Sequence, residues 1–308
     1  MILCCGEALI DMLPMSTSDG IDGYVPHAGG AVFNTAITLG RLGVRAGMLA
    51  GLSSDIFGQQ LRKALMGSHV DISFAVSTNR PTTLAFVQLT NGHATYSFYD
   101  ENSAGRMLLP DDLPTLPSEV SALYFSGISL ASEPGAEAYA SLCKKEAANR
   151  VVMVDPNIRP SFISDETAFR VRMDRMLAEA DIVKVSDEDL NWMVVGPASF
   201  REKVGVILDK GPKMLVITRG GEGAFAYTSC GEEVSVPSVK VAVRDTVGAG
   251  DTFNGGFLAK LAEMGLLSKD RLSEISREEI SEALSLGAKV ASINVSREGA
   301  NPPWANEL

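Results

Sequence analysis

Residues 245–256 read DTVGAGDTFNGG, a run of small residues that leads through an acid into an apolar pattern. Gly248, Ala249 and Gly250 stand directly before Asp251. Apolar residues then recur at helical spacing until a glycine stop at Gly265. This spacing predicts a helix whose first turn opens on a loop with almost no side chains.

Such a loop can bind an anion, because its backbone amides and the helix dipole face outward and no side chain blocks a phosphate. An acid beside a bound phosphate is useful there if it accepts a proton from an attacking hydroxyl. The helix N-terminus also favours the ionised carboxylate. We therefore interpret Asp251 as a candidate catalytic base. The alternative is that Asp251 only caps the helix and that the glycines serve packing.

A second informative stretch is AGGAVFNTAITLGRLG, residues 28–43. Gly29 and Gly30 permit a close approach of the backbone to a ligand. Asn34 offers a donor and an acceptor, as a polyhydroxy ligand requires, or else it caps the helix that begins here. Asp11 likewise has two interpretations: it binds hydroxyl groups of a ligand, or it belongs to a turn.

Short β-rich runs alternate with longer amphipathic patterns along the chain. Apolar strands separated by helices are typical of βαβ units, so we expect an α/β fold with a mostly parallel sheet covered on both faces. The predicted strands are 2–9, 45–52, 122–127, 150–157, 181–186 and 213–220. The predicted helices are 34–43, 57–67, 133–149, 166–180 and 199–211.

Two segments, about 12–28 and about 82–100, break this rhythm and alternate with a period of two residues. The second contains Asn91-Gly92, which predicts a hairpin turn. We expect both to form a small antiparallel sheet that closes as a lid over one end of a single domain, 1–308.

The same two segments are expected to carry an apolar face, which consists of Val25, Leu84 and Phe86. An exposed strand edge with an apolar face favours pairing with another copy. We therefore expect a homodimer that forms through the lid.

Composition limits the possible classes of function. The chain has 308 residues and a net charge of −11, which argues against nucleic-acid and membrane partners. Its four cysteines form no pairing pattern, and no basic segment precedes the acids near the N-terminus. These features predict a soluble cytoplasmic protein with reduced thiols. No Gly-Lys dipeptide occurs, which excludes a Walker A phosphate loop.

Taken together, these stretches resemble the PfkB, or ribokinase-like, family of carbohydrate kinases. DTVGAGDTFNGGFLAKL (245–261) is similar to the family's C-terminal signature, and AGGAVFNTAITLGRLGVRAGMLAGLSSDIFG (28–58) to its N-terminal one. The similarity runs from about residue 1 to 303. It implies a three-layer α/β/α core with a mostly parallel sheet and a small β lid. It also implies ATP-dependent phosphorylation of a sugar hydroxyl, with Mg²⁺ carried by the nucleotide.

The resemblance assigns roles to individual residues. Asp251 corresponds to the catalytic base, and the amides of Ala249 and Gly250, behind Gly248, to an anion hole. The implied sugar contacts are Asp11, Gly29, Gly30 and Asn34. The implied nucleotide contacts are Ser186, Thr218, Gly220, Gly223, Ala291 and Asn294. Asp189 falls where the family carries a longer acid that organises Mg²⁺ indirectly.

A monovalent-cation site is also implied. It matches Asp245 and the carbonyl groups of Val247, Asn294, Arg297 and Gly299. Pro303 stands where members often have a hydroxyl residue, so activation by K⁺ is left open.

The identity of the acceptor is open as well. DPNIRP (155–160) resembles the version found in fructokinases and 2-keto-3-deoxygluconate kinases. Asp100 stands where related sugar kinases often carry an arginine, whereas a ketodeoxy acid needs a cation for its carboxylate. A neutral ketohexose such as fructose is therefore the first expectation.

Several alternatives stand beside fructose. The acceptor could be 2-keto-3-deoxygluconate, or another sugar or nucleoside. From a different class, the chain could be a catalytically inactive sugar-binding sensor. Further substrate contacts are expected from Tyr99, Asn102 and Arg159. A surface salt bridge is the alternative role of Arg159.

Overall fold

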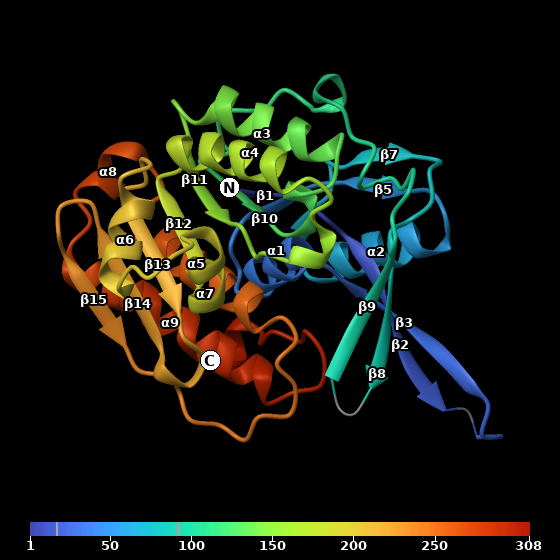
Figure 1. Cartoon of the computed structure of the whole chain (residues 1–308). Coiled ribbons are helices and arrows are strands. Elements are labelled where there is room, and N and C mark those ends of the chain that lie inside the picture. The colour runs from blue at the N-terminus through green and yellow to red at the C-terminus, as the bar shows by residue number, and fades with distance from the viewer. Residues whose placement is uncertain (17, 91–92) are drawn as a thin grey trace.

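The computed structural model describes residues 1–16, 18–90 and 93–308, and its main body is built on a nine-stranded sheet (Figure 1). From one edge to the other, the strands are β15 (Glu233–Val236), β14 (Ala224–Thr228), β13 (Met214–Thr218), β12 (Ile182–Ser186), β11 (Val151–Asp155), β10 (Ala122–Ser126), β1 (Ile2–Cys5), β4 (Ala46–Leu49) and β6 (Val70–Asp71). Every pairing from β13 to β6 is parallel, and β14 and β15 add an antiparallel edge.

Alternate residues of the buried strands face opposite helical layers, as the pleat requires. In β1, Ile2 and Cys4 pack into one core, while Leu3 and Cys5 pack into the other. The first core is covered by α1 (Ala31–Arg41), α2 (Ile56–Gly67), α7 (Ala249–Glu263), α8 (Lys269–Ser273) and α9 (Arg277–Val295). The second is covered by α3 (Gly135–Glu146), α4 (Glu166–Glu179), α5 (Asp187–Met193) and α6 (Phe200–Leu208). The predicted three-layer α/β/α architecture is confirmed.

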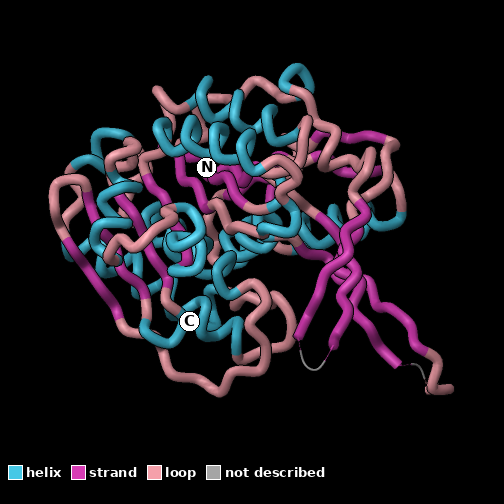
Figure 2. Tube along the Cα trace, viewed as in Figure 1, coloured by secondary structure: helices cyan, strands magenta, loops and turns pink. Residues whose placement is uncertain are grey.

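A smaller sheet projects from this body, as the strand trace in Figure 2 shows. Its order is β3 (Asp22–Gly29), β2 (Leu9–Ser16), β8 (Leu84–Thr90) and β9 (His93–Tyr99). The pairs β2–β3 and β8–β9 are antiparallel, as expected, and a parallel pairing of β2 with β8 joins them. The two remaining strands, β5 (Gly51–Ser53) and β7 (Val76–Thr78), pair with each other. We call the four-stranded unit the lid sheet; the turn predicted at Asn91-Gly92 lies outside the described residues.

The lid sheet leaves the body at the edge where the parallel strands end. Asp155, Ser186 and Thr218 are the last residues of β11, β12 and β13. The run predicted as one strand over 2–9 divides here, because β1 ends at Cys5 and the chain enters β2 at Leu9. Carboxyl ends of parallel strands are the usual place for ligands in such folds. None of the helices in the described ranges is long and apolar enough to cross a bilayer.

Candidate active site

Helix α7 begins directly behind the glycine loop that the sequence singled out. Its N-cap, Gly248, has φ 72°, a left-handed conformation that glycine adopts without strain, and a Cβ there would lie 2.7 Å from Ala300 Cβ. The amide of Ala249 donates to Thr246 O at 3.2 Å. The amide of Gly250 follows in the first turn, where helical N–H groups have no intrahelical acceptor. The loop therefore offers a bare helix N-terminus, with the amide of Ala249 already engaged in a turn.

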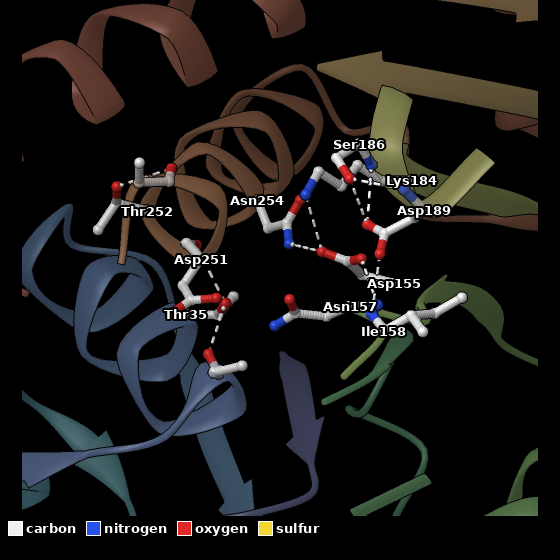
Figure 3. A network of polar contacts seen from close by, with 12 residues as sticks. Thr35, Asp155, Asn157, Ile158, Lys184, Ser186, Asp189, Asp251, Thr252 and Asn254 are labelled. Atoms are coloured by element: carbon white, nitrogen blue, oxygen red, sulfur yellow. Dashed lines mark hydrogen bonds and ion pairs between the residues drawn. The ribbon is translucent and has the colours of Figure 1, made fainter. Parts of the chain in front are cut away.

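Asp251 is the third residue of α7 and is 9% exposed. Its Oδ2 accepts a hydrogen bond from Asn34 Nδ2 at 2.9 Å, and its backbone oxygen accepts one from Thr35 Oγ1 at 3.0 Å. Figure 3 shows the side chain of Asp251 beside Thr35, between α7 and α1. The N-cap is Gly248 and no side chain caps the helix, so the helix-cap alternative for Asp251 is wrong.

Burial raises the pKa of Asp251 to about 7. The hydrogen bond from Asn34 and the charge of Lys184 lower this pKa, while the charges of Asp155 and Glu7 add to the rise. Desolvation therefore opposes the helix N-terminus, which favours the ionised carboxylate. A pKa near neutrality suits a group that must accept a proton and later release it.

The predicted sugar contacts meet at the base of the lid sheet. Asn34 is 7% exposed and lies within α1, whose N-cap is Gly30 with φ 110°, so Asn34 is not a helix cap. The amide of Asn34 donates to Gly30 O at 2.8 Å. A Cβ on Gly29 would overlap Asp11 Oδ2, and burial raises the pKa of Asp11 to about 6. Asn34 connects these residues to Asp251, because its side chain donates a hydrogen bond to Asp251 Oδ2.

Figure 3 shows a buried polar network around Lys184 and Asp155. A Cβ on Gly250 would lie 3.2 Å from Lys184 Nζ. Lys184 Nζ stands 3.0 Å from Asp155 Oδ2, which also accepts a hydrogen bond from Asn254 Nδ2 at 2.7 Å. Asn254 Nδ2 donates in addition to Tyr124 Oη at 2.9 Å. Sequence reasoning missed Lys184, Asn254 and Tyr124. A lysine inside an apolar strand was an available signal, because lysine is almost never fully buried unless it is paired.

Glu7 is a further buried acid that sequence reasoning missed. Its Oε1 accepts from the amide of Ala31 at 3.1 Å and its Oε2 from the amide of Ser129 at 3.3 Å. Burial raises the pKa of Glu7 despite these hydrogen bonds. Glu7 therefore joins the start of α1 to the loop that follows β10.

Ser186 and Asp189 form a capping box at the start of α5. Asp189 Oδ2 accepts from Ser186 Oγ at 2.7 Å and from the amide of Ser186 at 3.0 Å, while Oδ1 accepts from the amide of Ile158 at 2.9 Å. Both carboxylate oxygens of Asp189 thus have protein partners (Figure 3). The arrangement fixes the loop after β11 against α5.

A cavity of about 640 Å³ lies beside the loop before α7. The predicted residues that line it are Thr218, Gly220, Gly223, Ala249, Gly250 and Ala291. Ser186 and Asn294 are not among its lining residues in the described part of the chain. Val239, Val241 and Val243 add an apolar wall. An apolar slot that ends at a bare helix N-terminus suits a flat apolar group joined to an anion.

The residues of the predicted cation site are brought together. Asp245 Oδ1 accepts from the amide of Val247 and Oδ2 from the amide of Gly299, each at 2.9 Å. Asn294 Nδ2 donates to Val247 O at 2.9 Å, and Asn294 O accepts from the amide of Arg297 at 2.9 Å. These contacts join the loop before α7 to the end of α9.

The geometry does not support Tyr99 as a sugar contact. Tyr99 pairs with Leu84, whereas Asp11 pairs with Ala85. Paired residues share a face of a sheet and successive residues alternate, so Tyr99 and Asp11 point to opposite faces. Tyr99 is 59% exposed and packs edge-on against Phe86.

Asn102 and Arg159 are exposed. Arg159 Nη1 donates to Ile158 O at 3.0 Å. Arg159 forms no ion pair with any residue that the structure describes. Asp100 is buried and its Oδ1 lies 3.1 Å from Arg106 Nη1, so its charge is paired within the protein.

Comparisons with known proteins cover nearly the whole chain. A family profile described as "pfkB family carbohydrate kinase" matches residues 1–307. A protein named "Fructokinase" from Rhizobium leguminosarum bv. trifolii is 50% identical over 281 residues, which cover 91% of this chain and 85% of that protein.

Solved structures agree with this match. The fructokinase with bound ATP from Xylella fastidiosa is 30% identical, with a TM-score of 0.89 and coverage of 97% of this chain and 93% of that one. The aminoimidazole riboside kinase from Salmonella enterica is 26% identical, with a TM-score of 0.84 and coverage of 99% and 97%. With the profile match over residues 1–307, the fold and the glycine loop before Asp251, this chain belongs to the pfkB family of carbohydrate kinases.

Proposed function

We propose that this chain transfers the terminal phosphoryl group of ATP to a hydroxyl of a ketohexose, with fructose as the preferred acceptor. Asp251 accepts the hydroxyl proton, the sugar oxygen forms its bond to phosphorus, and the bond to the leaving ADP breaks. The observation that carries this proposal is the buried Asp251 carboxylate, held by Asn34 in the first turn of α7. Phosphoryl transfer needs mainly positioning and charge neutralisation, which this place supplies.

The preference for fructose is supported by the name of the 50% identical relative. Asp100 is paired with Arg106 and therefore does not offer a free carboxylate to sugar hydroxyls. The same pair leaves Arg106 neutralised, so it is a poor partner for the carboxylate of a ketodeoxy acid. A neutral acceptor is therefore still favoured.

An assay of ADP release across a panel of acceptors tests the proposal. The panel contains fructose, glucose, ribose, 2-keto-3-deoxygluconate and aminoimidazole riboside, each with ATP, Mg²⁺ and K⁺. We expect the highest kcat/KM for fructose. A higher value for another member replaces fructose in the proposal. Sugar binding by calorimetry without any turnover would establish the sensor alternative instead.

The activity should depend on pH through Asp251. Because the base must be unprotonated and the pKa of Asp251 in the free protein is about 7, we expect kcat/KM for fructose to rise with pH through about 7 and then level off. The activity is therefore lost on the acid side. Initial rates at fructose concentrations well below KM, from pH 5.5 to 9, measure this loss. A kcat/KM that is flat from pH 5.5 to 7.5 would contradict the assignment.

Mg²⁺ belongs with the nucleotide in this proposal. Within the described residues, no group of three or more His, Cys, Asp or Glu side chains is placed to hold a metal ion. A Mg²⁺ ion that arrives with the nucleotide phosphates and keeps most of its waters needs no such group of protein ligands. When bound, it would neutralise charge on the phosphates. We assign the ordering of one of its waters to Asp189 Oδ1, which accepts a single hydrogen bond, from the amide of Ile158, within the described residues.

We assign a K⁺ site to Asp245 and its neighbouring carbonyl groups. Asp245 fixes the loop before α7, so an ion bound there would support the anion loop. We expect kcat to rise several-fold when 100 mM (about physiological) K⁺ replaces Li⁺ at constant ionic strength. An Asp245→Ala variant should lose this response. Equal rates in the two salts would contradict the K⁺ assignment.

We also propose that 1–308 acts as one kinase domain whose lid sheet closes over the sugar. The expected apolar face is corrected, because Val25 pairs with Leu13 and so lies on the Asp11 face of the lid sheet, opposite Leu84 and Phe86. The face that carries Phe86 exposes Tyr24 and Tyr99, and Phe86 packs edge-on against both rings. An exposed aromatic face of this kind favours pairing of two lids. Sedimentation velocity at micromolar concentration should therefore give the mass of a dimer, and a monomer would count against the pairing.

A further inference from the structure

Lys184 is a lysine within a buried parallel strand. It is 4% exposed and lies in β12, between β11 and β13. Burial acts to lower the pKa of Lys184, but the nearby charges of Asp155, Asp189 and Asp251 outweigh it and raise the pKa. The side chain is therefore a buried ammonium ion. A buried charge is costly unless its hydrogen bonds are satisfied.

A single protein acceptor is not enough to satisfy the hydrogen-bond donors of the Lys184 ammonium group. It has three N–H donors, and the structure gives it one acceptor among the described residues, Asp155 Oδ2 at 3.0 Å. That oxygen is shared with Asn254 Nδ2. Two donors of Lys184 thus have no acceptor in the part of the protein that the structure describes, although buried polar groups are normally paired.

These donors lie beside the anion loop. A Cβ on Gly250 would lie 3.2 Å from Lys184 Nζ, so a larger residue would press on the ammonium group. Gly250 also lines the cavity of about 640 Å³. Asn254, one turn later in α7, ties the helix to Asp155 and so to the same ammonium group. The charge and the bare helix N-terminus thus meet at Gly250.

We propose that Lys184 is a catalytic residue whose ammonium group donates to the phosphoryl group in transfer, while Asp155 holds the ammonium in place. The inference rests on the proposed kinase function. The sugar oxygen bonds to phosphorus, the bond to ADP breaks, and the sugar proton passes to Asp251. Lys184 keeps its proton throughout. Its positive charge, fixed away from bulk water, offsets negative charge on the phosphoryl oxygens.

The competing role is structural: Lys184 would only neutralise Asp155. Removing Lys184 alone cannot separate the two roles, because it leaves a buried carboxylate unpaired and destabilises the fold. Removing both charges together is often tolerated. A structural lysine is then dispensable, whereas a catalytic one is not.

The test compares Lys184→Met, the double variant Lys184→Met with Asp155→Asn, and the control Lys213→Met. Lys213 also pairs with an acid, Asp181, but it lies directly before β13, at the amino ends of the parallel strands and away from the carboxyl ends that hold the site. The measurements are kcat and KM for fructose phosphorylation, and calorimetric Kd values for ADP and for β,γ-methylene-ATP. Thermal melting identifies the variants that fold.

We expect the folded double variant to lose about 10²–10³-fold in kcat, the usual effect of removing a charge-stabilising donor. Its KM for fructose should stay within about threefold of wild type, because Lys184 does not bind the sugar. The Kd for β,γ-methylene-ATP should rise about tenfold while that for ADP hardly changes, since the ammonium group meets only the third phosphate. Lys213→Met should match wild type.

Two results would overturn the role of Lys184. One is a double variant with near wild-type kcat, and the other is an equal loss of affinity for ADP and β,γ-methylene-ATP. If wild type phosphorylates no sugar, the kinase function fails by itself. The comparison of ADP with β,γ-methylene-ATP then still decides whether Lys184 meets the third phosphate.

Discussion

Replacing Asp251 by asparagine should lower kcat by roughly two to four orders of magnitude, the usual scale for losing a general base. The oxygen of the new amide can still accept the hydrogen bond from Asn34 that Asp251 Oδ2 accepts at 2.9 Å, so the side chain should keep its place. An amide cannot take the proton of the sugar hydroxyl. Folding and ATP binding should therefore be nearly unchanged. Steady-state ADP release, thermal melting and calorimetry with ATP measure these quantities.

Asp209→Asn is the matched control. Asp209 is exposed and follows α6, away from the carboxyl ends of the parallel strands. The same chemical change there should leave kcat within about twofold of wild type, as is usual for exposed positions. If Asp251→Asn retained more than a tenth of wild-type kcat, Asp251 would not be the base.

Replacing Asn34 by aspartate should also lower kcat strongly, and in a way that depends on pH. The new carboxylate would stand where Asn34 Nδ2 now donates to Asp251 Oδ2. Two carboxylates about 3 Å apart cannot both be ionised, so the pKa of one rises by roughly two units. The hydrogen bond that now lowers the pKa of Asp251 would also be lost. We expect kcat at pH 7 to fall about ten- to a hundredfold, with much of the loss recovered near pH 9.

This recovery distinguishes an electrostatic effect from a misfolded site. A pH–rate profile for Asn34→Asp measures it, with Asn149→Asp as the control at an exposed position. The control should reproduce the wild-type acid limb near pH 7. An Asn34→Asp profile with an unshifted acid limb would contradict the contact between Asn34 and the base.

The sequence alone predicted those features of the site that depend on consecutive residues of the chain. Gly248, Ala249, Gly250 and Asp251 are four consecutive residues, and the helix pattern after them sets their geometry. The alternation of apolar strands and helices likewise predicted the three layers, because buried parallel strands carry apolar residues on both faces.

Other features depended on contacts between distant segments. Lys184 meets Asp155 because β11 and β12 are neighbours, and Asn254 joins them from α7. The pairing of Asp100 with Arg106 depends on the fold of the segment after β9. The pKa of Asp251 depends on how much protein covers it, which local sequence does not reveal. Tyr99 was expected to contact the substrate, but the strand register, which pairs it with Leu84, decides which face of the sheet it occupies.

In the proposed mechanism, Asp251 and the N-terminus of α7 face one reacting phosphoryl group. A crystal structure with fructose and β,γ-methylene-ATP should therefore show a fructose hydroxyl about 2.6–3.2 Å from a carboxylate oxygen of Asp251, with the third phosphate at the amide of Gly250. A sugar bound with no hydroxyl near Asp251, or a third phosphate remote from Gly250, would contradict this mechanism.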